Sequence, residues 1–175
     1  MFLNKIKIFL LINICLLLFF LNYHDVKSKE IKIISGIAKV VDGDTIIINK
    51  KKIRLFGIDA PEKRQKCQKI WLQISFLIFN KDYPCGEISK IKLKNKIENK
   101  YVICKIKGKD RYKRLISECF RVKTNINAWM VRNGHAVAYR KYSKKYMSQE
   151  SYAKRKKLGL WSGKFEMPWE YRKKN

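Results

Sequence analysis

Histidine and acidic residues are scarce in this sequence. Its 175 residues contain only two histidines, and 14 Asp and Glu stand against 41 Lys and Arg, for a net charge of +27 at pH 7. His24 and His135 are its only histidines. This scarcity excludes a multi-histidine metal site, a Cys/His zinc finger and a Ser-His-Asp triad. Any chemistry must therefore come from carboxylates, guanidinium groups and a hard cation. The length allows one ordinary domain with a short appendage.

Long apolar runs are also lacking, apart from one near the N-terminus. Lys5 and Lys7 precede residues 8–21, which are apolar except for Asn13, and a polar stretch follows. The run is shorter than the roughly 20 residues that a membrane-spanning helix needs. This order is typical of a secretory signal peptide, so we expect residues 1–28 to be removed after Ser28 and the protein to be periplasmic or extracellular. An uncleaved membrane anchor is the alternative.

Cysteine usage agrees with export. Beyond the signal segment four cysteines remain, Cys67, Cys85, Cys104 and Cys119, and four cysteines allow three connectivities. Residues 101–107 and 114–121 read as two strands around a polar turn, which places Cys104 opposite Cys119 at cross-strand distance. The pairing of Cys67 with Cys85 then follows by elimination. Four buried free thiols are the alternative, expected in a reducing compartment.

Strand signals dominate the first part of the predicted domain, 29–175. Residues 31–58 alternate runs of β-branched residues with Gly, Asn and Asp, and the hairpin 101–121 adds two strands. Residues 63–85 mix helical and strand periods and are interpreted as an insertion of uncertain structure. The pattern predicts an α+β domain around a barrel-like sheet of five short strands.

Helical signals follow the insertion. From Gly86, the positions of Ile88, Ile91 and Leu93 suit an amphipathic helix. A short helix follows with Asn125 as its N-cap and Asn133-Gly134 as its end, and another is predicted over 144–158, ended by Gly159.

The few carboxylates of residues 31–81 gather at strand ends and turns. They are Asp42, Asp44, Asp59 and Glu62, and their oxygens suit one hard cation such as Ca²⁺. Each motif alone, Asp-Gly-Asp or Asp-Ala-Pro-Glu, is equally typical of a turn or a helix cap. Together, with Arg54 between them, they favour a site.

Arginine is rare against lysine, 9 to 32, and supplies the planar fork that suits a phosphate. Arg54 lies within a predicted strand, and Arg111 and Arg114 lie in the hairpin turn. Arg54 and Asp59 are five positions apart, so an ideal strand would point them to opposite faces. Gly57 or the end of the strand must redirect the chain if both serve one site.

The net charge attracts polyanions, and residues 139–146 interleave aromatic and basic side chains, as a single-strand nucleic-acid surface or a solvated helix edge would.

Four segments in this order, VVDGDTIII, IRLFGIDAPE, DRYKRL and INAWMVRNGHA…KKLGLWS, resemble the staphylococcal nuclease (thermonuclease) family over about residues 31–170. The resemblance implies an OB-fold, a five-stranded β-barrel with about three helices. It also implies Ca²⁺-dependent endonuclease cleavage of DNA and RNA to 3′-phosphate ends, by a monomer with no obligate protein partner.

The resemblance also assigns roles residue by residue. Asp44 and Asp59 match the Ca²⁺ carboxylates, with the backbone carbonyl of Ala60 as a further ligand. Glu62 matches the carboxylate that activates or orients the attacking water, and Arg54 and Arg114 match the two phosphate-binding arginines. Asp42 corresponds to a nearby acid of secondary importance.

The chain departs from the family pattern at three places. Ala60 stands where the staphylococcal enzyme has Thr, and Lys113 stands where a Gly commonly precedes the second arginine, which bears on the pose of Arg114. The 63–85 insertion follows Glu62 directly and is expected to alter substrate access.

Two other functions compete with the nuclease prediction. A non-catalytic OB-fold nucleic-acid-binding protein would tolerate loss of the carboxylates and arginines, yet all are present. A basic protein that binds anionic envelope lipid or polysaccharide would leave the four gathered carboxylates without a role.

Overall fold

The computed structural model describes residues 7, 12–14 and 31–175. Contacts between residues divide the chain into two units, 1–30 and 31–175. The predicted signal peptide, 1–28, lies almost entirely outside the described residues and stays a prediction. Among the helices in the described part of the chain, none is both long enough and apolar enough to cross a membrane.

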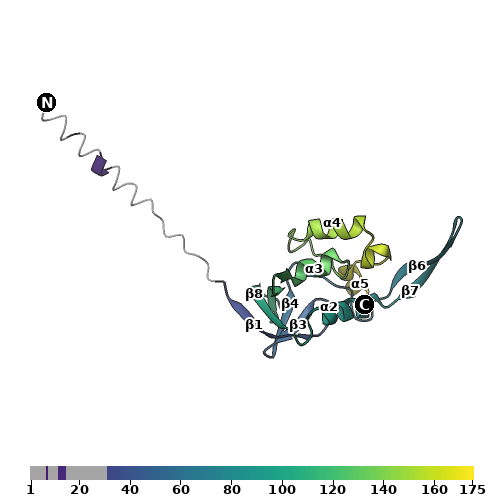
Figure 1. The fold of residues 1–175 in the computed structure, drawn as a ribbon, viewed down its shortest axis with the longest axis horizontal. Helices are drawn as coiled ribbons and strands as arrows, with labels where there is room; N and C mark the ends of the chain where they lie inside the picture. The colour runs from purple at the N-terminus through teal and green to yellow at the C-terminus, as the bar shows by residue number, and fades with distance from the viewer. Residues whose placement is uncertain (1–6, 8–11, 15–30) are drawn as a thin grey trace. The chain divides into compact units, whose positions relative to one another are not determined.

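A twisted sheet forms the centre of the 31–175 unit (Figure 1). Its five longer strands are β1 (Ile33–Ile37), β3 (Thr45–Ile48), β4 (Lys51–Leu55), β8 (Tyr101–Lys109) and β9 (Leu115–Arg121). The short strands β2 (Lys39–Val40) and β10 (Thr124–Asn125) extend it, and the order is β1-β8-β9-β4-β3-β2 with β10 on β9. Strands β4 and β9 are parallel, while the other pairs are antiparallel. The α+β OB-type fold is therefore confirmed.

Residues 31–175 hold four α-helices and one 3-10 helix, more than the three or so expected. They are α2 (Cys85–Ile97), α3 (Ile126–Arg132), α4 (Met147–Arg155), α5 (Pro168–Lys174) and the 3-10 helix η1 (Gly159–Ser162). The helix predicted over 144–158 is shorter because Lys157 takes a left-handed backbone conformation, with φ at 50°, just after the helix ends. Asn125 caps α3 as predicted, since its side chain accepts a hydrogen bond from the Ala128 amide.

The core lies between the sheet and helices α2 and α3. Ile46 and Ile53 from the sheet pack in one buried cluster with Leu93 of α2 and Met130 of α3. The helix predicted from Gly86 is confirmed as α2, and four of its five buried residues recur every four positions from Cys85 to Ile97. The prediction was wrong about Ile91, whose side chain is exposed.

Both predicted disulfides are present. In the hairpin of β8 and β9, Cys104 pairs directly with Cys119, and a disulfide joins them with Cα atoms 4.0 Å apart. A second disulfide joins Cys67 to Cys85, the first residue of α2.

The 63–85 insertion is a β-hairpin. Strands β6 (Cys67–Ile74) and β7 (Leu77–Tyr83) pair antiparallel, and β12 (Gly163–Lys164) pairs with the start of β6. Figure 1 shows this hairpin projecting from the rest of the unit. A separate two-stranded sheet joins β5 (Ile58–Asp59) to β11 (Val137–Ala138).

Candidate active site

Pairing between β3 and β4 brings Asp44 and Arg54 together. Thr45 lies directly opposite Arg54 in this pair, and the Leu55 amide donates to the Asp44 carbonyl. Asp44, which precedes β3, is thus held beside Arg54, whose Nη1 donates to Asp44 Oδ1 at 2.8 Å. The Asp44 side chain also accepts, through Oδ2, a hydrogen bond of 3.1 Å from the Ala60 amide.

A turn at Gly57 brings Asp59 to the same guanidinium. Gly57 has φ at 71°, a conformation that glycine adopts without steric strain, and it separates β4 from β5. Arg54 Nη2 then donates to Asp59 Oδ1 at 2.6 Å. The redirection that the five-residue spacing required is therefore confirmed, and one arginine bridges the two predicted metal carboxylates.

A second arginine, Arg172 of α5, joins Asp59 to Glu62. Arg172 Nη2 donates to Asp59 Oδ2 at 2.7 Å, and its Nη1 donates to Glu62 Oε1 at 2.6 Å. Asp59 is fully buried at 0% exposure, so each of its two oxygens accepts from a different guanidinium. The predicted water-activating residue and the predicted metal ligand are thereby linked through one side chain.

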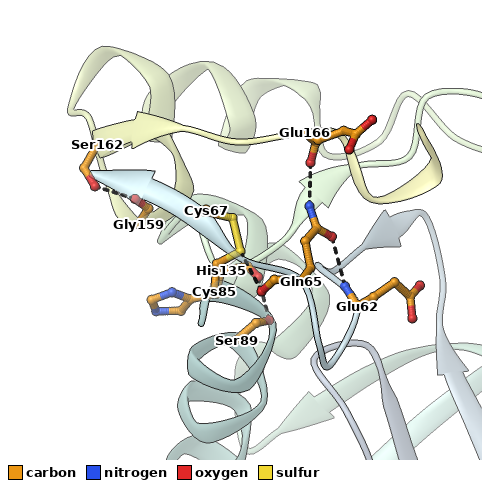
Figure 2. Close-up of a disulfide and its surroundings, with 9 residues drawn as sticks. All are labelled: Glu62, Gln65, Cys67, Cys85, Ser89, His135, Gly159, Ser162 and Glu166. Carbon is orange, nitrogen blue, oxygen red and sulfur yellow. Dashed lines mark hydrogen bonds between the residues drawn. A yellow bond between two sulfur atoms is a disulfide. The ribbon is translucent and has the colours of Figure 1, made fainter. Parts of the chain in front are cut away.

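The backbone beside Glu62 is held by Gln65, as Figure 2 shows. The buried Gln65 side chain accepts from the Glu62 amide at 3.1 Å and donates to the Glu166 carbonyl at 2.7 Å. The backbone amide of Gln65 also donates to the backbone carbonyl of Glu62. Cys85 Sγ lies 3.4 Å from the backbone carbonyl oxygen of Gln65. The Cys67–Cys85 disulfide and the segment before α5 therefore fix the loop that carries Glu62.

Arg114 lies apart from these contacts. Its Nε donates to Asp110 Oδ2 at 2.7 Å, and its amide donates to Asp110 Oδ1 at 2.9 Å. Lys113 takes φ at 63°, which explains why a glycine is common at this position in the family that the sequence resembles. The described contacts tie Arg114 to its own turn, so its role as a phosphate ligand stays a prediction.

The staphylococcal nuclease homologue family model matches residues 52–163. The chain belongs to the staphylococcal nuclease family. The family prediction is therefore confirmed. The matched segment includes Arg54, Asp59, Ala60, Glu62 and Arg114, while Asp44 and Arg172 lie outside it.

Individual relatives agree with the family. An uncharacterized endonuclease of Haemophilus influenzae is 35% identical over 133 residues, which cover 72% of this chain and 65% of the relative. The succinoglycan biosynthesis protein ExoI of Rhizobium meliloti is 33% identical over 141 residues, 79% of this chain and 69% of the relative. A micrococcal nuclease of Shigella flexneri is 31% identical over 156 residues, 78% of this chain and 79% of the relative. The match thus spans about two thirds of the first two relatives.

Burial and the arginines set the charge state of this staphylococcal nuclease site. Burial alone would lower the pKa of Arg54, but the charges of Asp44 and Asp59 outweigh it, and the pKa is raised. Burial raises the pKa of Asp59, and the Arg172 hydrogen bond offsets this only in part. Burial, followed by the charge of Asp44, raises the pKa of Asp42 to about 6. Asp42 also accepts a hydrogen bond from the Asp44 amide.

The donor chemistry of this family member fits a hard cation. Asp44, Asp59 and Glu62 offer carboxylate oxygens, and the adjoining backbone at Ala60 is buried against Asp44; such oxygens are the ligands of Ca²⁺. Within residues 7, 12–14 and 31–175, however, no three carboxylate, histidine or cysteine side chains converge as a metal site. Arg54 and Arg172 hold the carboxylates instead.

Sequence reasoning missed Arg172 and Gln65. The rarity of arginine against lysine was a usable signal for Arg172, and that signal was applied only to Arg54, Arg111 and Arg114. No local pattern marks Gln65, since its partners are the nearby Glu62 and the distant Glu166.

Proposed function

We propose that this chain is an exported, Ca²⁺-dependent endonuclease that hydrolyses phosphodiester bonds of DNA and RNA and leaves 3′-phosphate ends. The observation that carries the proposal is the buried pair Asp44 and Asp59, bridged by Arg54 and joined to Glu62 beside it. Membership of the staphylococcal nuclease family and relatives named as endonuclease and micrococcal nuclease support the reaction class.

Asp44, Asp59 and the Ala60 carbonyl are the residues proposed to hold Ca²⁺. When bound, the ion would supply a Lewis acid for a non-bridging phosphate oxygen and lower the pKa of a nearby water. Asp44 and Asp59 are buried, so their positions are fixed before substrate arrives. Such preorganisation avoids a reorganisation cost during the reaction.

Glu62 is proposed to take a proton from the attacking water or to hold that water in line. Its side chain is 40% exposed, so solvent and substrate reach it while its backbone is held by Gln65. General-base catalysis of this kind contributes typically about 10²–10⁴-fold. Arg54, and Arg114 from its turn, would stabilise the added negative charge on the phosphorus oxygens through charge-assisted hydrogen bonds.

Export through residues 1–28 is part of the proposal. The two disulfides of the 31–175 unit support it, because disulfides persist in oxidising compartments. The net charge of +27 would draw nucleic acid toward the site at moderate salt.

A cleavage assay tests the function. The purified protein is incubated with single-stranded DNA, duplex DNA and RNA, in Ca²⁺ or in chelator, beside Glu62→Gln and the matched control Glu87→Gln. Glu87 lies in the first turn of α2. We expect Ca²⁺-dependent fragments from the wild type and the control, and a loss of at least about 10²-fold in Glu62→Gln. Products should become substrates for polymerase extension only after phosphatase treatment, which reports 3′-phosphate ends.

Two outcomes would overturn the proposal. Fragmentation that persists in chelator would remove the metal from the mechanism. Tight nucleic-acid binding without cleavage in Ca²⁺ would leave the non-catalytic OB-fold binding protein as the better description.

A further inference from the structure

Helix α5 places Arg172 firmly against the site. Pro168 at its start is buried, and the Trp169 ring stacks parallel on Tyr139 with centroids 5.4 Å apart. Just before the helix, the Glu166 carbonyl accepts from Gln65. Helix α5 therefore packs against the rest of the unit and positions Arg172 beside Asp59 and Glu62.

Arg172 contacts the predicted metal carboxylate Asp59 and the predicted water-activating residue Glu62. Asp59 has two carboxylate oxygens; Arg54 donates to one and Arg172 to the other, while Arg172 also donates to Glu62. A cation that binds Asp59 must therefore displace a guanidinium. Arg172 is the one to leave, because its side chain is 35% exposed whereas that of Arg54 is 18% exposed.

We propose that Arg172, while also paired with Glu62, is an internal counter-cation that competes with Ca²⁺ for Asp59 and thereby sets the affinity of the site for the metal. This inference rests on the proposed function. Arg172 acts here as a positioning residue: it holds the two carboxylates at fixed separation and limits their mutual repulsion until the metal takes its place. Opposite unit charges about 4 Å apart near a protein surface attract each other, so removal of Arg172 should measurably change the affinity of Asp59 for another cation.

Calcium titration by calorimetry, without substrate, tests the competition. The full chain is compared with Arg172→Ala, Arg172→Lys and the control Lys173→Ala, which changes the neighbouring cation of α5. We expect Arg172→Ala to bind Ca²⁺ about tenfold more tightly and to gain more thermal stability from Ca²⁺ than the wild type does. Lys173→Ala should match the wild type, and Arg172→Lys should fall between wild type and Arg172→Ala, because lysine keeps the charge without the bidentate fork.

Each outcome is decisive. Equal or weaker Ca²⁺ binding by a folded Arg172→Ala, judged by its circular dichroism, would overturn the inference. If Arg172→Ala does not fold, Arg172→Lys decides in the same way. A wild type that binds no Ca²⁺ would instead refute the proposed function, so the two failures are distinguishable.

An independent observation concerns the β6–β7 hairpin, whose outer part is apolar and exposed. The exposed apolar residues of this segment are Ile70, Trp71, Leu72, Ile74, Phe76, Leu77, Ile78 and Phe79. Phe76 lies at the turn and is 86% exposed. Contiguous exposed apolar surface of this kind marks an interaction site.

The apolar residues occupy both faces of the hairpin. Leu72 and Ile74 are paired with Phe79 and Leu77 and share one face with them, whereas Ile78 is on the opposite face. A protein groove would cover one face of a two-stranded ribbon, while lipid would surround both. At about 3.3 Å for each residue, the apolar part from Ile70 to Phe76 is about 20 Å long, which is shorter than the hydrocarbon core of a bilayer, about 30 Å thick.

Basic side chains surround the base of the hairpin. Lys66, Lys69 and Lys81 are all exposed there, in a chain whose net charge is +27. Aromatic tips with flanking lysines suit a membrane interface with anionic headgroups. The Cys67–Cys85 disulfide and the pairing of β6 with β12 hold this base to the rest of the unit.

We infer that the β6–β7 hairpin docks the protein on an anionic lipid surface. Among the described strands, β7 pairs only with β6. Its outer backbone groups therefore need water or headgroups, which keeps the hairpin at the interface and out of the hydrocarbon centre. The nuclease would thus work while held at a membrane, with the hairpin as its contact.

Quenching of Trp71 by lipid tests this directly. The full chain is mixed with phosphatidylglycerol vesicles whose acyl chains carry bromine, and with brominated phosphatidylcholine vesicles as the neutral comparison. The signal is the difference in quenching between the wild type and Trp71→Phe, so that binding through any other segment does not count. We expect this difference on anionic vesicles, with about tenfold weaker binding on neutral ones. Phe76→Ser should weaken binding to anionic vesicles about tenfold, since it removes an exposed aromatic ring at the turn of the hairpin.

Val122→Ser is the matched control, because Val122 is 89% exposed elsewhere on the unit and should leave the signal unchanged. Absence of Trp71-dependent quenching would overturn the inference. A dimer in solution that Phe76→Ser dissociates would overturn it too, and would assign the hairpin to a second copy of the chain.

Discussion

Arg172 and Asp59 are 113 positions apart in the chain, and a hydrogen bond of 2.7 Å joins them. This contact makes the C-terminal helix part of the candidate active site. The last turn of α5 therefore contacts both a predicted metal carboxylate and the predicted water-activating residue. Truncation of this helix removes Arg172 and should change the affinity for Ca²⁺ while the sheet stays folded, because the main core is formed by other elements.

Arg54→Lys should lose about 10² in cleavage rate although the charge is kept. Lysine cannot bridge Asp44 and Asp59 with two parallel donors as Arg54 does, and loss of one preorganised donor costs about 10²–10³ in rate. Initial rates at saturating Ca²⁺ give the measurement, with Arg111→Lys in the exposed turn as control. Near-wild-type turnover of Arg54→Lys would show that the two parallel donors of Arg54 contribute nothing beyond its charge.

Lys113→Gly should stabilise the protein by about 0.5–1 kcal/mol. The left-handed conformation of Lys113 carries a steric cost of about 1–2 kcal/mol, which glycine would remove. Glycine would also lose about 0.5–1 kcal/mol of this gain, because its unfolded chain has more conformational entropy. Urea denaturation measures the free energy of unfolding. Lys109→Gly, in the extended backbone of β8, should lose stability; if both variants are destabilised alike, the strain argument is wrong.

Replacement of both cysteines of either disulfide by alanine should cost about 3 kcal/mol in the chain-entropy model. The sequence separations are 15 for Cys104–Cys119 and 18 for Cys67–Cys85, so entropy alone predicts nearly equal losses. Cys104 and Cys119 lie in the main core, and their removal should therefore cost more through lost packing. Thermal unfolding of the two double variants measures the difference. Cys67 and Cys85 are buried in a smaller cluster, so equal losses would show that burial in the main core adds no more than burial there.

His135 should titrate well below an ordinary histidine. Burial, and secondarily the charge of Lys92, lowers the pKa of His135 to about 4 from 6.5. The unfolded chain binds a proton at about 6.5, where the folded state does not. Between pH 6.5 and 4 the contribution of His135 to the free energy of unfolding should therefore fall as the pH is lowered.

The NMR titration of the imidazole gives this pKa directly, and the difference in stability between wild type and His135→Gln should follow this slope in the same window. A His135 midpoint near 6.5 would contradict the prediction.

Much of the candidate site was readable from the sequence because it is encoded locally. Asp44, Arg54 and Asp59 lie within 16 positions, and strand pairing plus the turn at Gly57 bring them together. The same holds for Cys104 and Cys119, whose hairpin register follows from their spacing. The spacing of apolar residues along a strand and the residues that form turns involve only near neighbours in the chain. The sequence by itself therefore determined these relationships.

Other features depended on tertiary packing alone. Arg172 reaches Asp59 only because Trp169 stacks on Tyr139 and Gln65 holds Glu166, contacts that no local period records. The 63–85 segment gave conflicting periods because its apolar residues are exposed on both faces of a hairpin, whereas sequence patterns assume one buried face. Ile91 likewise fits a helical stripe yet is exposed. Periodicity predicts which side chains share a face, but the packing of distant segments decides which face is buried and which charges meet there.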